Sequence, residues 1–441
     1  MKTPLIVLFI FLFSLTGLAQ HSISGNFTPS TDFKWLILYQ LTPGSQRYVT
    51  DTAIKEGYFK LELPENASVG MYRIVYAVPQ DEFYIDVIYN GKEDIEFNFN
   101  LEEGIHVIAS EENKTYYNYF SEINTVDKEL SDFYAAKNND KKEFSEIAKK
   151  ISEVQARYEV KAGDLLVHQF VSSNLPYIPE TYENFDTYNT IRKKRYFDAL
   201  DVTNALLQSS GFLEQKLSNY VFSALPSNGQ NNEPIQDTIL VNVDVVSKKL
   251  SDTPVPFRTE VFHDLWKTAS ENNLYAVSDT IFDAYLKDLA TQNGDQALVD
   301  AIELSSRLRI GAVSPEISWE ENGTTKTLLG LQGAEKYVLV FWSSTCSHCL
   351  KELPLLHTAL KTYDNVTVVA VGLEDDDTYW NKEIMNLPNF KHAIALGKWE
   401  SDHAKLFGIQ QTPTYFILDT EKRFLAAPED DKEVVEFLDK N

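Results

Sequence analysis

The feature that most constrains the fold of this chain is a pair of cysteines, Cys346 and Cys349, which are the only two in 441 residues. An apolar run rich in valine and aromatic residues, 337–342, precedes them and predicts a buried strand. Leucines recur at helical spacing after them, between 350 and 360. The pair is therefore predicted to lie where a strand leads into a helix, with Cys346 near the helix N-terminus.

This placement suits thiol chemistry. The positive end of a helix dipole and its unpaired backbone N–H groups favour a thiolate. Thiol–disulfide exchange needs one thiol of lowered pKa to attack a disulfide and a second thiol nearby to resolve the mixed disulfide. We predict Cys346 as the nucleophile and Cys349 as the resolving thiol.

Two other interpretations of the cysteine pair remain open. One is an inert structural disulfide, which exported proteins use, although a bridge closing so small a loop constrains little of the unfolded chain. The other is a zinc site, which would need two further ligands. His348 and His357 are nearby, but there is no second pair of metal-ligand spacing. We therefore predict no metal, and no cofactor beyond a redox-active Cys346–Cys349 disulfide.

The residues around the pair resemble the active site of the TlpA/ResA-type thioredoxin-like proteins of bacterial envelopes. The matching positions are Trp342, Cys346, Cys349, Glu352 and Pro354. The resemblance covers residues 310–441 and implies a thioredoxin-like α/β sandwich. The order of predicted elements, which alternates strands and helices after the active-site helix, fits that fold. Residues 314–317 resemble the first strand of the family.

The resemblance also implies a substrate-binding surface. Residues 411–414 resemble the family loop whose proline, here Pro413, is cis and faces the disulfide. A cis Pro413 would present the backbone of Thr412 to an incoming peptide beside the cysteines. Trp342 is expected both to pack in the core and to form a wall of the site.

Glu352 lies one helical turn after Cys349, so it can approach the cysteines from within. The matching glutamate of the family is thought to mediate proton transfer to the cysteines, and thioredoxin's own buried aspartate is replaced here by Val340. A carboxylate on the helix surface is the other interpretation of Glu352.

Between the cysteines the family usually ends the dipeptide with proline, whereas this chain has Ser347 and His348. An imidazole beside the helix N-terminus can stabilise the Cys346 thiolate. Ser347 and His348 are therefore predicted to tune the redox potential.

The remaining chain predicts an α+β multidomain protein. Residues 1–19 have the charged start, apolar core and small terminal residues of a signal peptide. Residues 20–110 alternate in short β-type runs separated by turns, which predicts an antiparallel β-sandwich resembling the domain often fused to envelope thioredoxin-like proteins. Residues 111–309 have apolar residues at helical spacing between proline-containing breaks, which predicts a helical region. Residues 310–441 form the thioredoxin-like domain.

The formal charge of −25 argues against nucleic acid as a partner. The basic cluster 192–195 stands alone in this acidic chain. We interpret it as a solvated helix face, with a docking patch as the alternative.

These observations together predict a soluble periplasmic thiol–disulfide oxidoreductase that reduces protein disulfides. The expected partners are disulfide-bearing envelope proteins and a membrane thiol donor that re-reduces the pair, with no stable membrane insertion after signal cleavage. The alternatives are a disulfide isomerase or oxidase, or a non-catalytic envelope binding protein with a vestigial redox domain.

Overall fold

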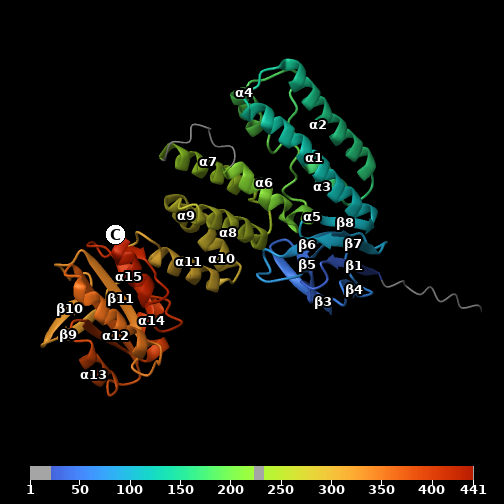
Figure 1. Ribbon diagram of the computed structural model, residues 1–441. Helices are drawn as coiled ribbons and strands as arrows, with labels where there is room; N and C mark the ends of the chain where they lie inside the picture. The colour runs from blue at the N-terminus through green and yellow to red at the C-terminus, as the bar shows by residue number, and fades with distance from the viewer. Residues whose placement is uncertain (1–20, 223–232, 441) are drawn as a thin grey trace, which may run out of the picture. The chain divides into compact units, whose positions relative to one another are not determined.

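The computed structural model describes residues 21–222 and 233–440 (Figure 1). The predicted signal peptide, residues 1–19, lies outside these residues. The chain divides into two compact units, one ending at Asn293 and the other beginning at Gly294. Strands precede helices in the first unit, and strands alternate with helices in the second, so the predicted multidomain fold class is confirmed.

The first unit begins with eight strands, which are β1 (Ser22–Thr28), β2 (Trp35–Thr42), β3 (Ser45–Ala53), β4 (Tyr58–Glu62), β5 (Gly70–Val75), β6 (Tyr84–Tyr89), β7 (Ile95–Asn100) and β8 (Gly104–Ala109). They form two four-stranded sheets, of order β4-β1-β7-β8 and β3-β2-β5-β6. Alternate residues of both sheets share one hydrophobic core, as in a β-sandwich. One pair departs from the predicted antiparallel arrangement: β1 and β7 run parallel, with Ile23 opposite Ile95.

The helical part of this unit contains α1 (Glu111–Ala135), α2 (Lys141–Ala162), α3 (His168–Ser173), α4 (Phe185–Lys194), α5 (Ala205–Gln208), α6 (Gly211–Phe222), α7 (Glu233–Lys249), α8 (Val255–Glu271), α9 (Tyr275–Ile281), the π-helical turn η1 (Phe282–Leu286) and α10 (Lys287–Gln292). The helical periodicity of residues 144–154 and 261–266 corresponds to α2 and α8. No helix among the described residues is long and apolar enough to cross a membrane.

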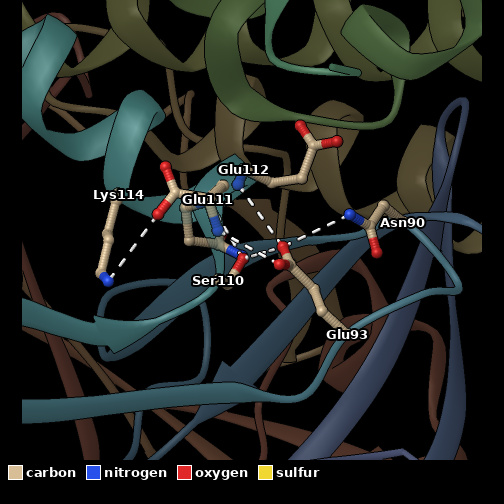
Figure 2. Close-up of polar contacts among 7 residues, drawn as sticks. Asn90, Glu93, Ser110, Glu111, Glu112 and Lys114 are labelled. Atoms are coloured by element: carbon tan, nitrogen blue, oxygen red, sulfur yellow. Dashed lines mark hydrogen bonds and ion pairs between the residues drawn. The ribbon is translucent and has the colours of Figure 1, made fainter. Parts of the chain in front are cut away.

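A polar junction holds α1 against the sandwich (Figure 2). The Ser110 hydroxyl caps the helix by accepting the backbone N–H of Asn113 at 3.2 Å. The Glu93 carboxylate accepts the Ser110 hydroxyl at 2.7 Å and the backbone N–H of Glu111 at 3.3 Å. A negative charge at a helix N-terminus is stabilising, so Glu93 ties the loop before β7 to the first turn of α1.

A second close approach joins the sandwich to α8. The turn between β2 and β3 contains Gly44, whose φ is +70°. A Cβ atom built there would lie 2.1 Å from the backbone carbonyl carbon of Pro256 and 2.4 Å from the backbone nitrogen of Phe257. Only glycine fits this contact, since both the backbone angle and the space exclude a side chain.

The second unit contains α11 (Gln296–Leu308), β9 (Ser318–Glu321), β10 (Thr324–Thr327), β11 (Lys336–Trp342), α12 (Cys349–Ala359), η2 (Leu360–Thr362), β12 (Val366–Glu374), α13 (Trp380–Glu383), η3 (Ile384–Asn386), β13 (Lys391–Leu396), η4 (Lys398–Glu400), α14 (Asp402–Leu406), β14 (Thr414–Leu418), β15 (Phe424–Ala426) and α15 (Asp431–Lys440). Its main sheet has five strands in the order β13-β12-β11-β14-β15. The family's first strand, expected at 314–317, is not in this sheet; β9 begins at Ser318 and pairs with β10 as a separate hairpin.

The central strand β11 runs parallel to β12 and antiparallel to β14. Its successive side chains enter two different cores, with Leu339 and Phe341 on one face and Val340 and Trp342 on the other. Helices α12 and α15 cover the Trp342 face, and α14 covers the opposite face. This three-layer arrangement confirms the predicted thioredoxin-like α/β sandwich.

Candidate active site

The cysteine pair lies where the central strand leads into a helix, as the sequence predicts. The chain leaves β11 at Trp342 and enters α12 at Cys349. Cys349 is 0% exposed, whereas Cys346 precedes the helix by three residues and is half-buried. Both cysteines are free thiols in this structure.

Three backbone groups surround the Cys346 sulfur. The thiol donates a hydrogen bond to the carbonyl oxygen of Thr412 at 3.4 Å, and it accepts the backbone N–H of Cys349 at 3.3 Å. The backbone N–H of His348 also hydrogen-bonds to this sulfur. Thr412 precedes Pro413, and the peptide bond between them is cis. The fold thus brings Cys346, Cys349, Thr412 and Pro413 together, although more than 60 residues separate the two segments.

The two thiols have opposite electrostatic surroundings. Partial burial on its own would raise the pKa of Cys346, but hydrogen bonds from the side chains of Cys349 and Thr412 and from backbone N–H groups hold it below its ordinary value. Burial, and then the hydrogen bond to Cys346, raise the pKa of Cys349 to about 12. Near neutral pH the exposed sulfur is therefore the more readily ionised one.

Glu352 is half-buried on α12 and contacts the next strand. Its carboxylate accepts a hydrogen bond from the Tyr415 hydroxyl at 3.2 Å. Tyr415 is fully buried on β14, and burial followed by the charge of Glu352 raises the pKa of its phenol. No hydrogen bond joins Glu352 to either sulfur within the described residues, so a transferred proton would have to cross a gap or a bridging molecule.

Trp342, Ser347 and His348 were also predicted as site residues, and their positions relative to the cysteines differ. Trp342 is 1% exposed and packs in the same core as Cys349, as expected of a packing residue, so it supports the site from the core side. Ser347 and His348 are exposed. Among the described residues the His348 imidazole has no hydrogen-bond partner, and it is the backbone N–H of His348 that reaches Cys346.

One carboxylate of the site was missed from the sequence. Glu374, the last residue of β12, is 3% exposed. It accepts the backbone N–H of Ser344 at 2.5 Å and the hydroxyl of Ser343 at 3.4 Å. The Ser343 carbonyl in turn accepts the backbone N–H of Cys346 at 3.1 Å. Glu374 therefore fixes the loop that carries Cys346. An acidic residue ending an apolar parallel strand beside the catalytic strand was the available signal.

Comparisons with known proteins place this site in context. Residues 333–424 match a family model described as thioredoxin-like. None of the curated proteins matches this chain in sequence. Because the match contains Cys346, Cys349, Glu352 and Pro413, it covers the site and most of the five-stranded sheet.

Several solved structures are similar to part of the chain. The thioredoxin domain of a thiol-disulfide oxidoreductase from Bacteroides vulgatus is 22% identical, covers 30% of this chain and 97% of its own, and has a TM-score of 0.27. A domain of a possible thiol-disulfide isomerase from Cytophaga hutchinsonii is 26% identical over 30% of this chain and 92% of its own, with a TM-score of 0.27. A thioredoxin-like protein from Bacteroides caccae is 16% identical over 60% of this chain and 97% of its own, with a TM-score of 0.31.

Proposed function

We propose that the protein is a thiol–disulfide oxidoreductase that reduces disulfides of other proteins through Cys346 and Cys349. The observation that carries this proposal is the contrast between the two thiols. Cys346 is accessible and has a lowered pKa, while Cys349 is buried beside it and has a pKa of about 12. A structural disulfide would not need this contrast. Thiol–disulfide exchange does, because the accessible thiol of lowered pKa attacks the substrate and the buried thiol resolves the mixed disulfide.

The reaction would proceed in two steps. The Cys346 thiolate attacks one sulfur of the substrate disulfide, a bond forms between these sulfurs, and the substrate S–S bond breaks to release a thiolate that takes up a proton. Cys349 then loses its proton and attacks the Cys346 sulfur, which releases the second substrate thiol and leaves a Cys346–Cys349 disulfide. The substrate gains two electrons, and a thiol donor returns two electrons to the pair in the next cycle.

The direct test is reduction of insulin disulfides by the full chain with dithiothreitol as donor. Turnover well above the dithiothreitol background supports the proposal, and no turnover would favour the binding-protein alternative. Natural substrates are identified with Cys349→Ser, because this variant leaves Cys346 linked to its partner in a mixed disulfide.

We further propose export to the periplasm and re-reduction by a membrane thiol donor, on the basis of the signal-like residues 1–19. Cell fractionation with N-terminal sequencing tests this. We expect a mature chain that begins near residue 20, and a full-length cytoplasmic protein would contradict the compartment.

Glu352 is proposed to accept the proton that Cys349 must lose before it can attack. Because the pKa of Cys349 is about 12, its ionisation limits the second step near neutral pH. We expect Glu352→Gln to slow the resolution of a preformed mixed disulfide about 100-fold while its fold stays intact. Stopped-flow measurement of resolution against pH checks this, with Glu436→Gln, an exposed carboxylate on α15, as the control. An unchanged pH–rate profile would make Glu352 a surface carboxylate.

The redox potential is proposed to lie between the roughly −270 mV of thioredoxin and the roughly −120 mV of DsbA. Contacts that stabilise the Cys346 thiolate stabilise the reduced form and raise the potential. Since the His348 backbone N–H is one such contact, His348→Pro removes both the imidazole and this donor. We expect the potential to fall by about 30 mV or more, which is roughly 1.4 kcal/mol for two electrons.

The matched variant His348→Ala keeps the N–H and removes only the imidazole. Because the imidazole is exposed and without a hydrogen bond among the described residues, we expect its potential to change by less than half as much as that of His348→Pro. Equilibration of both variants with glutathione measures the two potentials. An unchanged or raised potential in His348→Pro would mean that this position does not set it.

A further inference from the structure

The helical part of the first unit contains a cavity of about 1090 Å³. Its walls come from α1, α4, α6 and the segment 173–182, which lie near one another in Figure 1. Pockets that bury drug-sized molecules measure roughly 300–1,000 Å³. This cavity is therefore large enough for an organic molecule with several rings.

The charge of the cavity is opposite to that of the protein. Five cationic side chains and one carboxylate line it, in a chain whose net charge is −25; these are Lys137, Arg192, Lys193, Arg195, Lys216 and Asp127. Three of the cations belong to the basic cluster that we interpreted from sequence as a solvated helix face. Arg192 and Lys193 are half-buried, so that interpretation fails for these two residues.

Among the described residues, three of the five cations lack a partner of opposite charge, whereas Arg195 is paired with Asp198. In the described part of the chain, no carboxylate lies within 4.0 Å of Arg192, Lys193 or Lys216. Each of them instead lies over an aromatic ring: the Arg192 guanidinium is 5.7 Å from the Tyr188 centroid, and the Lys216 ammonium is 5.7 Å from that of Phe212. Desolvated cations without counter-charges cost free energy that an anion in the cavity would recover.

Burial affects the ionisation of these groups. It lowers the pKa of Lys216, although the charge of Asp127 opposes the shift, and it lowers the pKa of Lys193. Burial also raises the pKa of Asp127, against the charges of Lys216 and Arg192. Asp127 is thus a weak counter-charge for Lys216 and Arg192.

Much of the apolar part of the wall is aromatic. Eight tyrosine and phenylalanine rings line the cavity, and two of them, Tyr177 and Tyr188, are stacked at 5.7 Å with an interplanar angle of 30°. Aromatic faces offer flat contact surfaces to another ring system. A ligand complementary to both the cationic and the aromatic residues of the wall would combine a flat apolar body with negative charge.

We propose that this cavity is a binding site for an organic anion, a drug-sized molecule that carries one or two carboxylate, sulfonate or phosphate groups on a flat, largely apolar body. The guanidinium of Arg192 supplies a planar pair of donors for such a group, and Lys216 supplies a point charge. All residues of this cavity belong to the first unit, whereas both cysteines belong to the second.

Two fluorescent probes test the proposal on the full chain. Anilinonaphthalenesulfonate has the aromatic body and a sulfonate, while N-phenylnaphthylamine has nearly the same body without charge. We expect fluorescence titration to give at least about tenfold tighter binding for the sulfonate, the effect of one charge-assisted contact. Equal affinities for the two probes would overturn the anion site.

Variants locate the binding. Arg192→Gln and Lys216→Gln are each expected to weaken sulfonate binding about tenfold to hundredfold and to leave the neutral probe unaffected. Lys142→Gln, a cation on α2 with an exposed side chain, is the matched control. The two variants are independent, so either one that retains the wild-type circular dichroism and melting transition decides the outcome. Unchanged binding of the sulfonate in that variant would overturn the proposal.

Competition distinguishes a small molecule from an acidic peptide. Naphthoate is expected to displace the sulfonate probe, whereas a hexapeptide of glutamate at the same concentration is not. Displacement by the peptide alone would show that the cavity is part of a protein-docking surface and would contradict the proposed ligand class.

Discussion

Replacing Cys346 with serine is expected to abolish thiol–disulfide exchange, and replacing Cys349 with serine is expected to stop the cycle at the mixed disulfide. The first variant loses the only accessible thiol of lowered pKa, so no initial attack remains. The second retains this attack and lacks the resolving thiol. Insulin turnover should fall to the background in both variants, and only Cys349→Ser should accumulate covalent adducts on non-reducing gels.

The pH dependence of alkylation separates the two thiols further. Iodoacetamide reacts with thiolates, so its rate at each cysteine follows the ionised fraction. Cys346, whose pKa is depressed, should reach half of its maximal rate below pH 9, whereas Cys349 should still be gaining reactivity as the pH approaches about 12. Mass spectrometry of partly alkylated protein identifies the modified residue. Faster labelling of Cys349 would reverse their proposed roles.

Gly44→Ala is expected to destabilise the first unit by about 3 kcal/mol or more. A non-glycine residue at a left-handed φ costs roughly 1–2 kcal/mol, and forced overpacking adds about 1–3 kcal/mol. Here the new Cβ would lie 2.1 Å from the backbone carbonyl carbon of Pro256, and backbone atoms at the start of a helix cannot rotate away. The backbone N–H of Gly44 also donates a hydrogen bond to the Glu260 carboxylate, which any shift of the turn would weaken.

Gly104→Ala provides the control within the same unit. Gly104 also has a positive φ, +78°, but no atom lies within 4 Å of the position of its Cβ. The free energy of unfolding of Gly104→Ala should therefore fall only by the cost of the backbone conformation, about 1–2 kcal/mol. Urea denaturation followed by circular dichroism gives both free energies of unfolding. Equal losses in the two variants would show that the contact between the turn and α8 does not form.

The sequence predicted the parts of this fold that depend on local pattern. The apolar run before Cys346 became β11, because a central strand is buried on both faces and needs apolar residues at every position. Most residues of β3 are exposed or half-buried, so it lacks the alternation that identifies a half-buried strand. The parallel pairing of β1 with β7 joins residues about 70 positions apart, and no local pattern encodes it.

The candidate site could likewise be predicted where it depends on neighbouring residues in the sequence, and not where it depends on contacts between distant segments. The proposed roles of Cys346 and Cys349 were inferred from their expected positions near the N-terminus of a helix. The contact of Glu374 with the loop of Ser343 was missed, because it depends on the register between β11 and β12, although its place at the end of an apolar strand was a signal. The packing of Trp342 in the core was predicted, because it ends an apolar run that forms the central strand.

The hydrogen bond from the Cys346 thiol to the Thr412 carbonyl has a consequence for the timing of catalysis. A thiolate has no proton to donate, so ionisation of Cys346 breaks this bond and leaves the Thr412 oxygen free to accept the backbone N–H of an arriving polypeptide. Docking and ionisation are then thermodynamically linked, and each promotes the other by the same factor. Under the proposed function, an extended substrate strand that hydrogen-bonds to the Thr412 oxygen would therefore favour the Cys346 thiolate that attacks it.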